Sequence, residues 1–316
     1  MTWTIDDDTV RALLTPGDAV GWMEEALARH HAGTLEAPPR LAAPLGGGRL
    51  VLTAGHSGDE FYGYRTYDTL PTTSDEQVTV AHDTTTGRVL AVHVGHALGA
   101  CWTGALGGVA TRHLGPGSDD VTVGIVGAGT QAWAQLWALT ASLTPSAVRV
   151  TSRTPAGREA FADRARRELG LSVEAVASPR DAVAGADVVI LATSSSSPVI
   201  DAAWLDPDVL VITVGPKQVG RAELAVDLVA CADLVVTDSP AQLRAYDPPA
   251  LVADAGMADR VASLGEIVAA SGGPAAEGST GPQRRGRRVY LSVGLAGTEV
   301  HLLGRLWEQH GRQAPV

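Results

Sequence analysis

Apolar runs and polar segments alternate along the middle of the chain, from residue 121 to about residue 270. The apolar runs carry almost no charge, as strands buried on both faces of a parallel sheet do. The alternation of such runs with helical segments is typical of a doubly wound parallel sheet. The predicted strands start at residue 121 and then span residues 146–154, 173–176, 187–193, 209–214 and 234–237, the last clear strand, and the predicted helices span residues 132–143, 156–169 and 179–186.

The two ends of the chain follow other patterns. Residues 17–31 have the apolar spacing of an amphipathic helix, and residues 98–114 form a predicted helix rich in Ala and Gly. Between these helices lie strand-like runs, the last two of which are typical of an antiparallel hairpin, at residues 49–54, 77–82 and 88–94. Residues 289–307 predict an amphipathic helix that returns to the N-terminal part of the chain.

These patterns predict an α/β fold with two domains. A Rossmann-type doubly wound parallel sheet is expected over residues 116–288. A second, α+β domain is expected to be built from both chain ends, residues 1–115 and 289–316.

The segment VTVGIVGAGTQA, which begins at residue 121, combines a buried strand, a glycine-rich turn and the start of a helix. Gly127 permits the tight turn, Gly129 lets the backbone approach a ligand, and Ala132 is small enough for close packing of helix on strand. Thr130 and Gln131 open the helix, whose free N–H groups and positive dipole end suit the pyrophosphate of a dinucleotide. The segment therefore predicts a nicotinamide or flavin cofactor.

The end of the second strand decides which form of the cofactor fits, because this position meets the adenosine ribose. An acidic residue there favours a free 2′-hydroxyl. This chain has instead Ser152, Arg153 and Thr154, which suit a 2′-phosphate through charge-assisted hydrogen bonds. NADP(H) is therefore the preferred cofactor and NAD(H) the alternative. A solvated loop arginine is the other interpretation of Arg153.

Ligands of such sheets bind beyond the carboxyl ends of the strands. Two further strand ends are therefore expected on the cofactor side: Thr193 with Ser194, which starts a serine run, and Val214, shortly before Lys217. The serine run also has the composition of a plain loop.

Composition excludes several other classes of protein. A net charge of −11 and a pI near 5.2 argue against a nucleic-acid surface. Neither Cys101 nor Cys231 has a zinc-like spacing, so no metal site is predicted. The basic cluster at residues 284–288 is expected to be a solvated loop. No signal segment and no membrane-spanning run is recognised, which predicts a cytoplasmic protein without a membrane partner.

Five motifs together resemble the ornithine cyclodeaminase/mu-crystallin family over nearly the whole chain. They are DTTTGRVLAV, ATRHL, GIVGAGTQA, TSRT and YLSVGLAGTEV. The resemblance implies a homodimer in which the N-terminal domain supplies both the dimer sheet and the pocket for a small-molecule substrate. The nicotinamide ring is then expected at the cleft between the domains. Members of the family include ketimine reductases, alanine dehydrogenases, cyclic-imine reductases and cyclodeaminases.

Four family positions decide the chemistry, and only one is unchanged. Arg40 matches the arginine that binds the substrate carboxylate, although a surface arginine after a Pro-Pro turn is the alternative. Arg65 stands where the family has its catalytic lysine; it can bind an anion but is a poor proton shuttle. Trp102 replaces a second carboxylate-binding arginine with an apolar wall, or is a plain core tryptophan. Lys217 replaces the aspartate with which cyclodeaminases handle the substrate amine.

Lys217 and His96 are the candidate proton donors. Burial and cationic neighbours can lower the pKa of a lysine toward neutrality, and a histidine titrates near neutral pH without help. Tyr62, Tyr64 and Tyr67 flank Arg65 and are further candidates to donate a proton, from a phenol, although strand alternation puts the first two on the face opposite Arg65.

Three functions follow from the altered site. An NAD(P)H-dependent reductase of an imine, ketimine or related carbonyl in a carboxylate-bearing molecule is favoured. A redox-neutral cyclodeaminase is disfavoured, because the ammonium of Lys217 repels a protonated diamine. A non-catalytic nucleotide-binding homologue is the third hypothesis.

Overall fold

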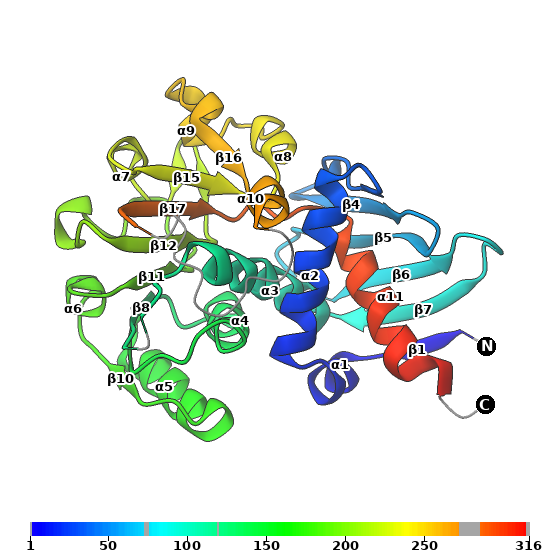
Figure 1. Ribbon diagram of the computed structural model, residues 1–316, viewed down its shortest axis with the longest axis horizontal. Helices are drawn as coiled ribbons and strands as arrows, with labels where there is room; N and C mark the ends of the chain where they lie inside the picture. The colour runs from blue at the N-terminus through cyan, green and yellow to red at the C-terminus, as the bar shows by residue number, and fades with distance from the viewer. Residues whose placement is uncertain (1, 73–75, 119, 272–284, 314–316) are drawn as a thin grey trace.

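Two large β-sheets lie side by side, with helices packed between and over them (Figure 1). The computed structural model describes residues 2–72, 76–118, 120–271 and 285–313. The eight-stranded sheet is parallel throughout and has the order β10-β9-β8-β11-β12-β17-β15-β16. Its strands are β8 (Thr122–Val126), β9 (Ala147–Thr151), β10 (Val173–Ala175), β11 (Val188–Leu191), β12 (Val209–Thr213), β15 (Leu234–Thr237), β16 (Val261–Ser263) and β17 (Arg287–Leu291).

The order of these strands confirms the predicted doubly wound sheet. From β8 the chain builds outward through β9 and β10, and it then returns to add β11 and β12 on the other side of β8. The strand order therefore reverses between β8 and β11, the kind of position where such sheets bind ligands. The helices of this part are α4 (Thr130–Leu139), α5 (Pro155–Leu169), α6 (Pro179–Val183), α7 (Val226–Ala230), α8 (Pro240–Arg244), α9 (Leu251–Asp254) and α10 (Leu264–Ala270).

The helix predicted over residues 289–307 is wrong at its start. Strand β17 pairs with β12 on one side and β15 on the other, so it lies inside the eight-stranded sheet. Helix α11 begins only at Thr298 and ends at His310. The last clear strand was predicted to end at residue 237, but two further strands of the sheet, β16 and β17, follow it.

Two arginines of the basic cluster belong to β17 and not to a solvated loop. The guanidinium of Arg288 is buried, donates to the carbonyl oxygen of Leu114 at 2.9 Å and pairs with Asp208. A buried charge is stable only with such partners. Arg284 lies outside the described residues.

The seven-stranded sheet has the order β1-β7-β6-β5-β4-β2, with β3 paired to β4. The predicted hairpin is confirmed as β6 and β7, but the sheet is not purely antiparallel, because β1 pairs parallel to β7. Its strands are β1 (Trp3–Ile5), β2 (Leu35–Glu36), β3 (Leu41–Leu45), β4 (Gly48–Ser57), β5 (Phe61–Asp68), β6 (Gln77–Asp83) and β7 (Val89–Gly95), and the helices of this part are α1 (Asp7–Leu13), α2 (Pro16–His31) and α3 (Ala97–Leu114).

Alternation along β5 separates two faces of this sheet. Tyr62 and Tyr64 are 37% and 39% exposed on the outer face, as expected, whereas Arg65 is 8% exposed on the inner face. Helix α11 covers the inner face, where Gly304 packs directly on the ring of Phe61. The strand period thus turns Arg65 toward the interior of the molecule.

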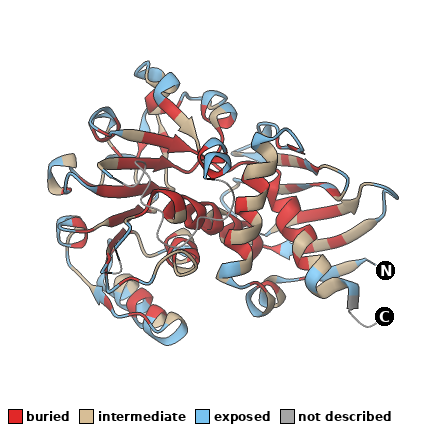
Figure 2. Cartoon of the chain, viewed as in Figure 1, coloured by how far each residue is buried: buried red, intermediate tan, exposed pale blue. Residues whose placement is uncertain are grey.

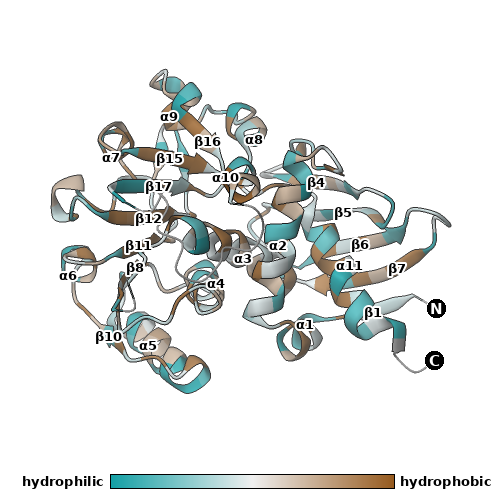
Figure 3. Cartoon of the chain, viewed as in Figure 1, coloured by the Kyte–Doolittle hydropathy of each residue, from teal (hydrophilic) through white to brown (hydrophobic). Residues whose placement is uncertain are grey.

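Helix α3 joins the two parts of the molecule and packs against both α4 and α2 (Figure 1). Almost all of its residues are buried (Figure 2), and strand β12 of the eight-stranded sheet is strongly hydrophobic (Figure 3). The core is therefore continuous across the junction and fixes the two sheets relative to each other. Within the described ranges, no helix has the length and apolarity needed to cross a membrane.

Candidate functional site

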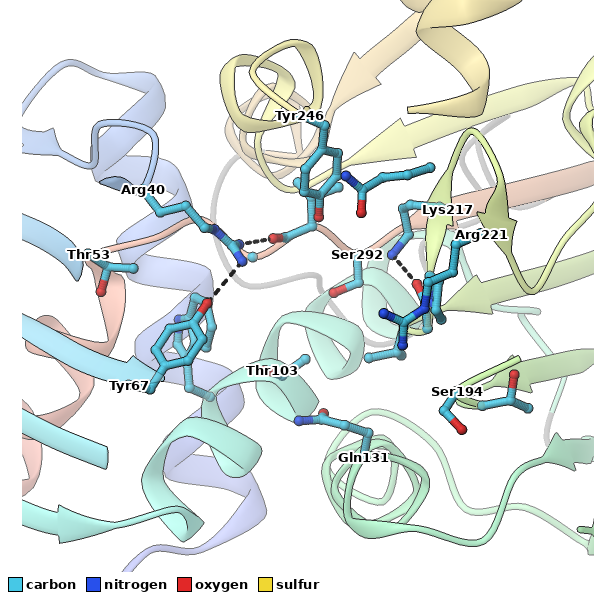
Figure 4. Close-up of a pocket in the computed structure, with 18 of the residues that line it drawn as sticks. Arg40, Thr53, Tyr67, Thr103, Gln131, Ser194, Lys217, Arg221, Tyr246 and Ser292 are labelled. Carbon is cyan, nitrogen blue, oxygen red and sulfur yellow. Dashed lines mark hydrogen bonds between the residues drawn. The ribbon is translucent and has the colours of Figure 1, made fainter. Parts of the chain in front are cut away.

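A cavity of about 450 Å³ lies where the two sheets meet, beyond the carboxyl ends of β11 and β12 (Figure 4). Its lining combines residues from both parts of the chain. These are Arg40, Thr53, Arg65, Tyr67, Trp102, Thr103, Gln131, Thr193, Ser194, Val214, Gly215, Pro216, Lys217, Gln218, Arg221, Tyr246, Ser292, Val293 and Gly294. Four of them are cations, and no Asp or Glu is among them.

The guanidinium of Arg40 is fixed by three acceptors. Its Nε donates to Oε1 of Gln242 at 3.2 Å, one Nη donates to the Tyr67 hydroxyl at 3.3 Å, and the other donates to the carbonyl oxygen of Val293. An arginine has five N–H donors, so two remain for a ligand. The side chain is thus oriented in advance, as the binding of a planar carboxylate requires.

Arg65 is held by groups that lie behind the cavity wall. Its Nε and one Nη donate to Oε1 of Gln77 at 2.9 and 2.6 Å, and the other Nη lies 3.4 Å from Oε1 of Glu299. Its guanidinium carbon lies 5.5 Å from the Trp102 ring centroid and 4.6 Å from that of Tyr67. These contacts leave Arg65 charged and in place, a role that suits binding and not proton transfer.

Trp102 is a wall of the cavity that cannot move easily. Its indole N–H donates to Oγ1 of Thr298 at 2.8 Å. Gly294, whose φ is +81°, packs on the ring, and a Cβ at this glycine would lie 2.6 Å from the indole. The left-handed backbone and the missing side chain both favour glycine here.

Lys217 stands in β13 (Lys217–Gln218), which forms a small hairpin with β14 (Arg221–Ala222). Its ammonium donates to the carbonyl oxygen of Gly215 at 2.7 Å. Burial lowers the pKa of Lys217 to about 8, although Glu223 and Asp238 act in the opposite direction. It is also the one lysine among the 24 Lys and Arg residues of the chain. Lys217 can therefore release a proton, whereas an arginine stays protonated.

Glu223 holds the base of this hairpin against the ends of β11 and β12. Its two oxygens accept from the backbone N–H and the hydroxyl of Thr193, both at 2.8 Å, from the Thr213 hydroxyl at 2.7 Å and from the Gly215 N–H at 2.6 Å. With all four donors engaged, this buried carboxylate serves the backbone and does not face the cavity.

The glycine-rich segment has the geometry predicted for a dinucleotide cradle. Gly127 has a φ of +115°, and a Cβ there would lie 2.3 Å from the carbonyl oxygen of Ala192. Gly129 is different: its φ is −92°, and a Cβ would meet nothing within 4 Å. Neither backbone conformation nor internal packing requires glycine at 129, and the space beside it is open. Helix α4 begins at Thr130 without a side-chain cap.

The end of β9 lies beside this cradle, because the Gly127 N–H donates to the carbonyl oxygen of Thr151 at 2.9 Å. Arg153 is exposed. Thr154 caps α5 with its hydroxyl, and Ser152 donates its hydroxyl to the carbonyl oxygen of Thr154 at 3.0 Å. Arg158 donates to the carbonyl oxygen of Ser152 at 3.3 Å, which places a second guanidinium at this corner.

The cavity brings together eight of the sixteen residues selected from the sequence. Arg40, Arg65, Trp102 and Lys217 line it, together with the expected cofactor residues Gln131, Thr193, Ser194 and Val214. His96 does not line it; this residue precedes α3, and its Nδ1 lies 3.0 Å from a carboxylate oxygen of Asp7.

Sequence reasoning missed several lining residues. Tyr67 is not one of them, because it was already named as a neighbour of Arg65, and alternation along β5 places it on the same face as Arg65. Arg221, Tyr246 and Ser292 come from a short hairpin and from loops, for which no periodic pattern exists.

Comparisons with known proteins agree with this architecture. The family model described as the ornithine cyclodeaminase/mu-crystallin family matches residues 6–309. The ketimine reductase mu-crystallin of Rattus norvegicus is 31% identical over 214 residues, which are 68% of this chain and 63% of that protein, less than two thirds of its length. Among solved structures, the Thermococcus litoralis Δ1-pyrroline-2-carboxylate reductase in complex with NADH and L-proline has a TM-score of 0.86, with 24% identity and full coverage of both chains.

An archaeal alanine dehydrogenase dimer with bound NAD also has a fold similar to that of this chain. Its TM-score is 0.84 with 22% identity, and the match covers 100% of this chain and 98% of that one. These two likenesses concern the fold, whereas the family model reads the sequence itself over nearly its whole length. The chain therefore belongs to the ornithine cyclodeaminase/mu-crystallin family.

Proposed function

We propose that this protein is an NAD(P)H-dependent oxidoreductase that reduces the C=N bond of an imine or ketimine, or a related carbonyl, in a small molecule carrying a carboxylate. One observation carries the proposal: the chain's single lysine and the fixed guanidinium of Arg40 line the same cavity as the cofactor-side residues Gln131, Thr193 and Val214. A reductase of this kind needs a proton donor, a group that binds the substrate carboxylate and a site for the nicotinamide within one pocket.

The residues present fit a nicotinamide dinucleotide. The uncapped start of α4 and the open space at Gly129 suit its diphosphate. Oε1 of Gln131 is buried without a hydrogen-bond partner in the described structure, so it offers an acceptor to a ligand amide. A bound nicotinamide would supply a hydride to the carbon of the C=N bond, and the nitrogen would need one proton to complete the amine.

Lys217 is the residue that we assign to this proton. With a pKa near 8 its ammonium holds a proton at neutral pH but releases it more readily than an exposed lysine does. Arg40 binds the substrate carboxylate, while Arg65 and Trp102 shape the opposite wall. His96 is the weaker candidate, because it lies outside the cavity lining and faces Asp7.

Two finer features belong to the same proposal. Arg153, together with Arg158 beside it, favours the 2′-phosphate of NADP(H) over NAD(H). The outer face of the seven-stranded sheet carries exposed apolar side chains, including Leu50, Tyr64 and Val94, and such a face suits a homodimer. The dimeric archaeal relative supports this assembly.

Names of relatives support a reductase, since the rat protein is a ketimine reductase and the Thermococcus litoralis protein reduces a cyclic imine acid by its name. A cyclodeaminase is the second candidate. The cations Lys217 and Arg221 line the pocket where a protonated diamine would have to bind, which disfavours it.

The test is to mix the protein with NADPH or NADH and a panel of cyclic and acyclic imine carboxylates, and to follow the loss of absorbance of the reduced cofactor. Imine-dependent oxidation of the cofactor supports the proposal. Ammonia release from a diamino acid without net absorbance change would establish the cyclodeaminase. Cofactor binding without turnover of any imine would establish a non-catalytic protein.

A further inference from the structure

The four cations of the cavity come from its two opposite sides. Arg40 and Arg65 come from the part of the chain that forms the seven-stranded sheet, and Lys217 and Arg221 come from the β13–β14 hairpin. Figure 4 shows Arg40 with Tyr67 on one side of the cavity and Lys217 with Arg221 on the other.

Arg221 differs from the other three cations in its surroundings. Arg40 donates to three acceptors, Arg65 to Gln77 and Glu299, and Lys217 to Gly215. The guanidinium of Arg221 makes no hydrogen bond or ion pair with any described residue, so all five of its N–H donors are available to a ligand. It nevertheless lines the cavity beside Lys217.

The carboxylates that act on Arg40, Arg65 and Lys217 are already engaged. Glu223 accepts four hydrogen bonds, Asp238 accepts the backbone N–H groups of Val293 and Gly294, and Glu299 accepts from Thr53 and Gly297. They stabilise backbone and cations from behind the wall but do not line the cavity. The hairpin side therefore presents positive charge and free donors without an acidic partner.

From this arrangement we infer that the substrate carries two anionic groups, a 2-carboxylate bound by Arg40 and a distal carboxylate bound by Arg221. This inference rests on the proposed reductase function, and it assigns Arg221 as the residue that selects dicarboxylic over monocarboxylic imines. A planar guanidinium suits the distal group because it can bind a carboxylate through two parallel hydrogen bonds. Lys217 remains the proton donor beside it.

Matched substrates isolate the distal group. 2-Oxoglutarate and 2-oxopentanoate have the same chain length and differ in a terminal carboxylate against a methyl group; each forms an imine with ammonium in solution. Turnover with NADPH is measured for both, in the wild-type protein and in the variants Arg221→Gln and Arg221→Lys. Arg180→Gln removes the same charge from α6, away from the cavity lining, and is the matched control.

We expect the wild type to favour the dicarboxylic imine by about tenfold or more in kcat/KM, as a charge-assisted pair supports. Arg221→Gln then loses most of this preference, Arg221→Lys keeps part of it, and Arg180→Gln keeps all of it. The inference is overturned if the wild type favours the monocarboxylic imine or if Arg221→Gln leaves the ratio unchanged. An unchanged ratio with weaker NADPH binding would assign Arg221 to the cofactor diphosphate instead.

A binding measurement separates this inference from the proposed function. Glutarate and pentanoate are titrated calorimetrically into the NADP⁺-saturated protein, which needs no turnover. Tighter binding of glutarate that Arg221→Gln abolishes supports the two-anion pocket even in a protein that reduces no imine. Equal binding of the two acids overturns it, while turnover of the monocarboxylic imine alone would leave the reductase function standing.

Discussion

The ammonium nitrogen of Lys217 lies 2.7 Å from the carbonyl oxygen of Gly215, two residues earlier in the chain. This hydrogen bond keeps a buried amine at the carboxyl end of β12, next to the N–H that Gly215 gives to Glu223. The same short turn therefore fixes both the carboxylate of Glu223, at the base of the hairpin, and the amine of Lys217, which faces the cavity. A general acid must be positioned in this way before its pKa matters.

The pH dependence of turnover tests the role of Lys217. Because burial lowers the pKa of Lys217 to about 8, the ammonium form predominates at neutral pH and is lost above pH 8. We expect kcat to fall by about tenfold per pH unit above that value. In Lys217→Met this limb disappears and kcat is lower by about 100-fold or more. Unchanged turnover and an unchanged pH profile in Lys217→Met would remove Lys217 from the chemistry.

The single lysine also allows a direct measurement. With only the N-terminal amine as a second primary amine, reductive ¹³C-methylation should yield one side-chain resonance. Its chemical shift is followed against pH, and a midpoint near 8 is expected for the buried group. A midpoint near 10.4, the value of an exposed lysine, would contradict the assignment.

Arg153 is expected to decide between the two forms of the cofactor. Arg153→Ala removes the exposed guanidinium at the end of β9 but no contact within the fold, since it makes none with a described residue. We expect the Kd for NADPH to rise about tenfold or more, as loss of a charge-assisted phosphate contact implies, and the Kd for NADH to change little. Equal effects on the Kd values of both cofactors would show that Arg153 is a solvated loop arginine that does not bind the 2′-phosphate.

Space at Gly129 provides a test of the cradle that does not depend on catalysis. A Cβ at this glycine meets nothing within 4 Å, and its φ of −92° is open to any residue. Gly129→Val should therefore leave Tm within a few degrees, while cofactor binding falls strongly because the side chain occupies the ligand's space. Gly127→Val is the contrast: with φ at +115° and backbone 2.3 Å from the added Cβ, it should unfold the protein. Undiminished cofactor binding by Gly129→Val would place the diphosphate elsewhere.

Much of the fold could be predicted from the sequence, because strands β8, β11, β12 and β15 of the eight-stranded sheet are apolar runs without a charged residue. β17 escaped this reasoning because Arg287 and Arg288 give it the appearance of a basic loop, and their burial depends on distant partners such as Asp208 and Leu114. Local sequence does not reveal such pairings.

The candidate site could be predicted only in part. Gly127 to Ala132 carry a local motif, and the resemblance supplied Arg40, Arg65, Trp102 and Lys217. Arg221 and Tyr246 reach the cavity through tertiary contacts of short loops. His96, a candidate proton donor from the sequence, faces Asp7 and not the cavity, an outcome that depends on where α1 packs.

The outer face of the seven-stranded sheet is expected to be the dimer interface. Val94 is 40% exposed on this face, and Val226, which is also 40% exposed, lies on α7 in the other part of the molecule. We expect Val94→Asp to shift the protein from dimer to monomer in light scattering, because burying an unpaired charge is costly. Val226→Asp is the matched control and should remain dimeric. A dimer that tolerates Val94→Asp would exclude this face.

A buried ionic cluster at the junction between the two sheets predicts how stability depends on pH. Glu24 accepts from Nε2 of His113 at 2.5 Å and from Arg112 at 2.6 Å, and although burial alone raises the pKa of Glu24, these partners together lower it below its ordinary value. Because the folded-state pKa is depressed, the stabilisation is present above about pH 4.3, the ordinary glutamate value, and is lost as the pH falls below it. Glu24→Gln should cost about 3 kcal/mol near neutral pH and flatten this acid limb in urea denaturation. Glu168→Gln breaks the exposed pair with Arg164 instead and should cost under about 0.5 kcal/mol; equal losses in the two variants would show that Glu24 contributes no more than a surface charge.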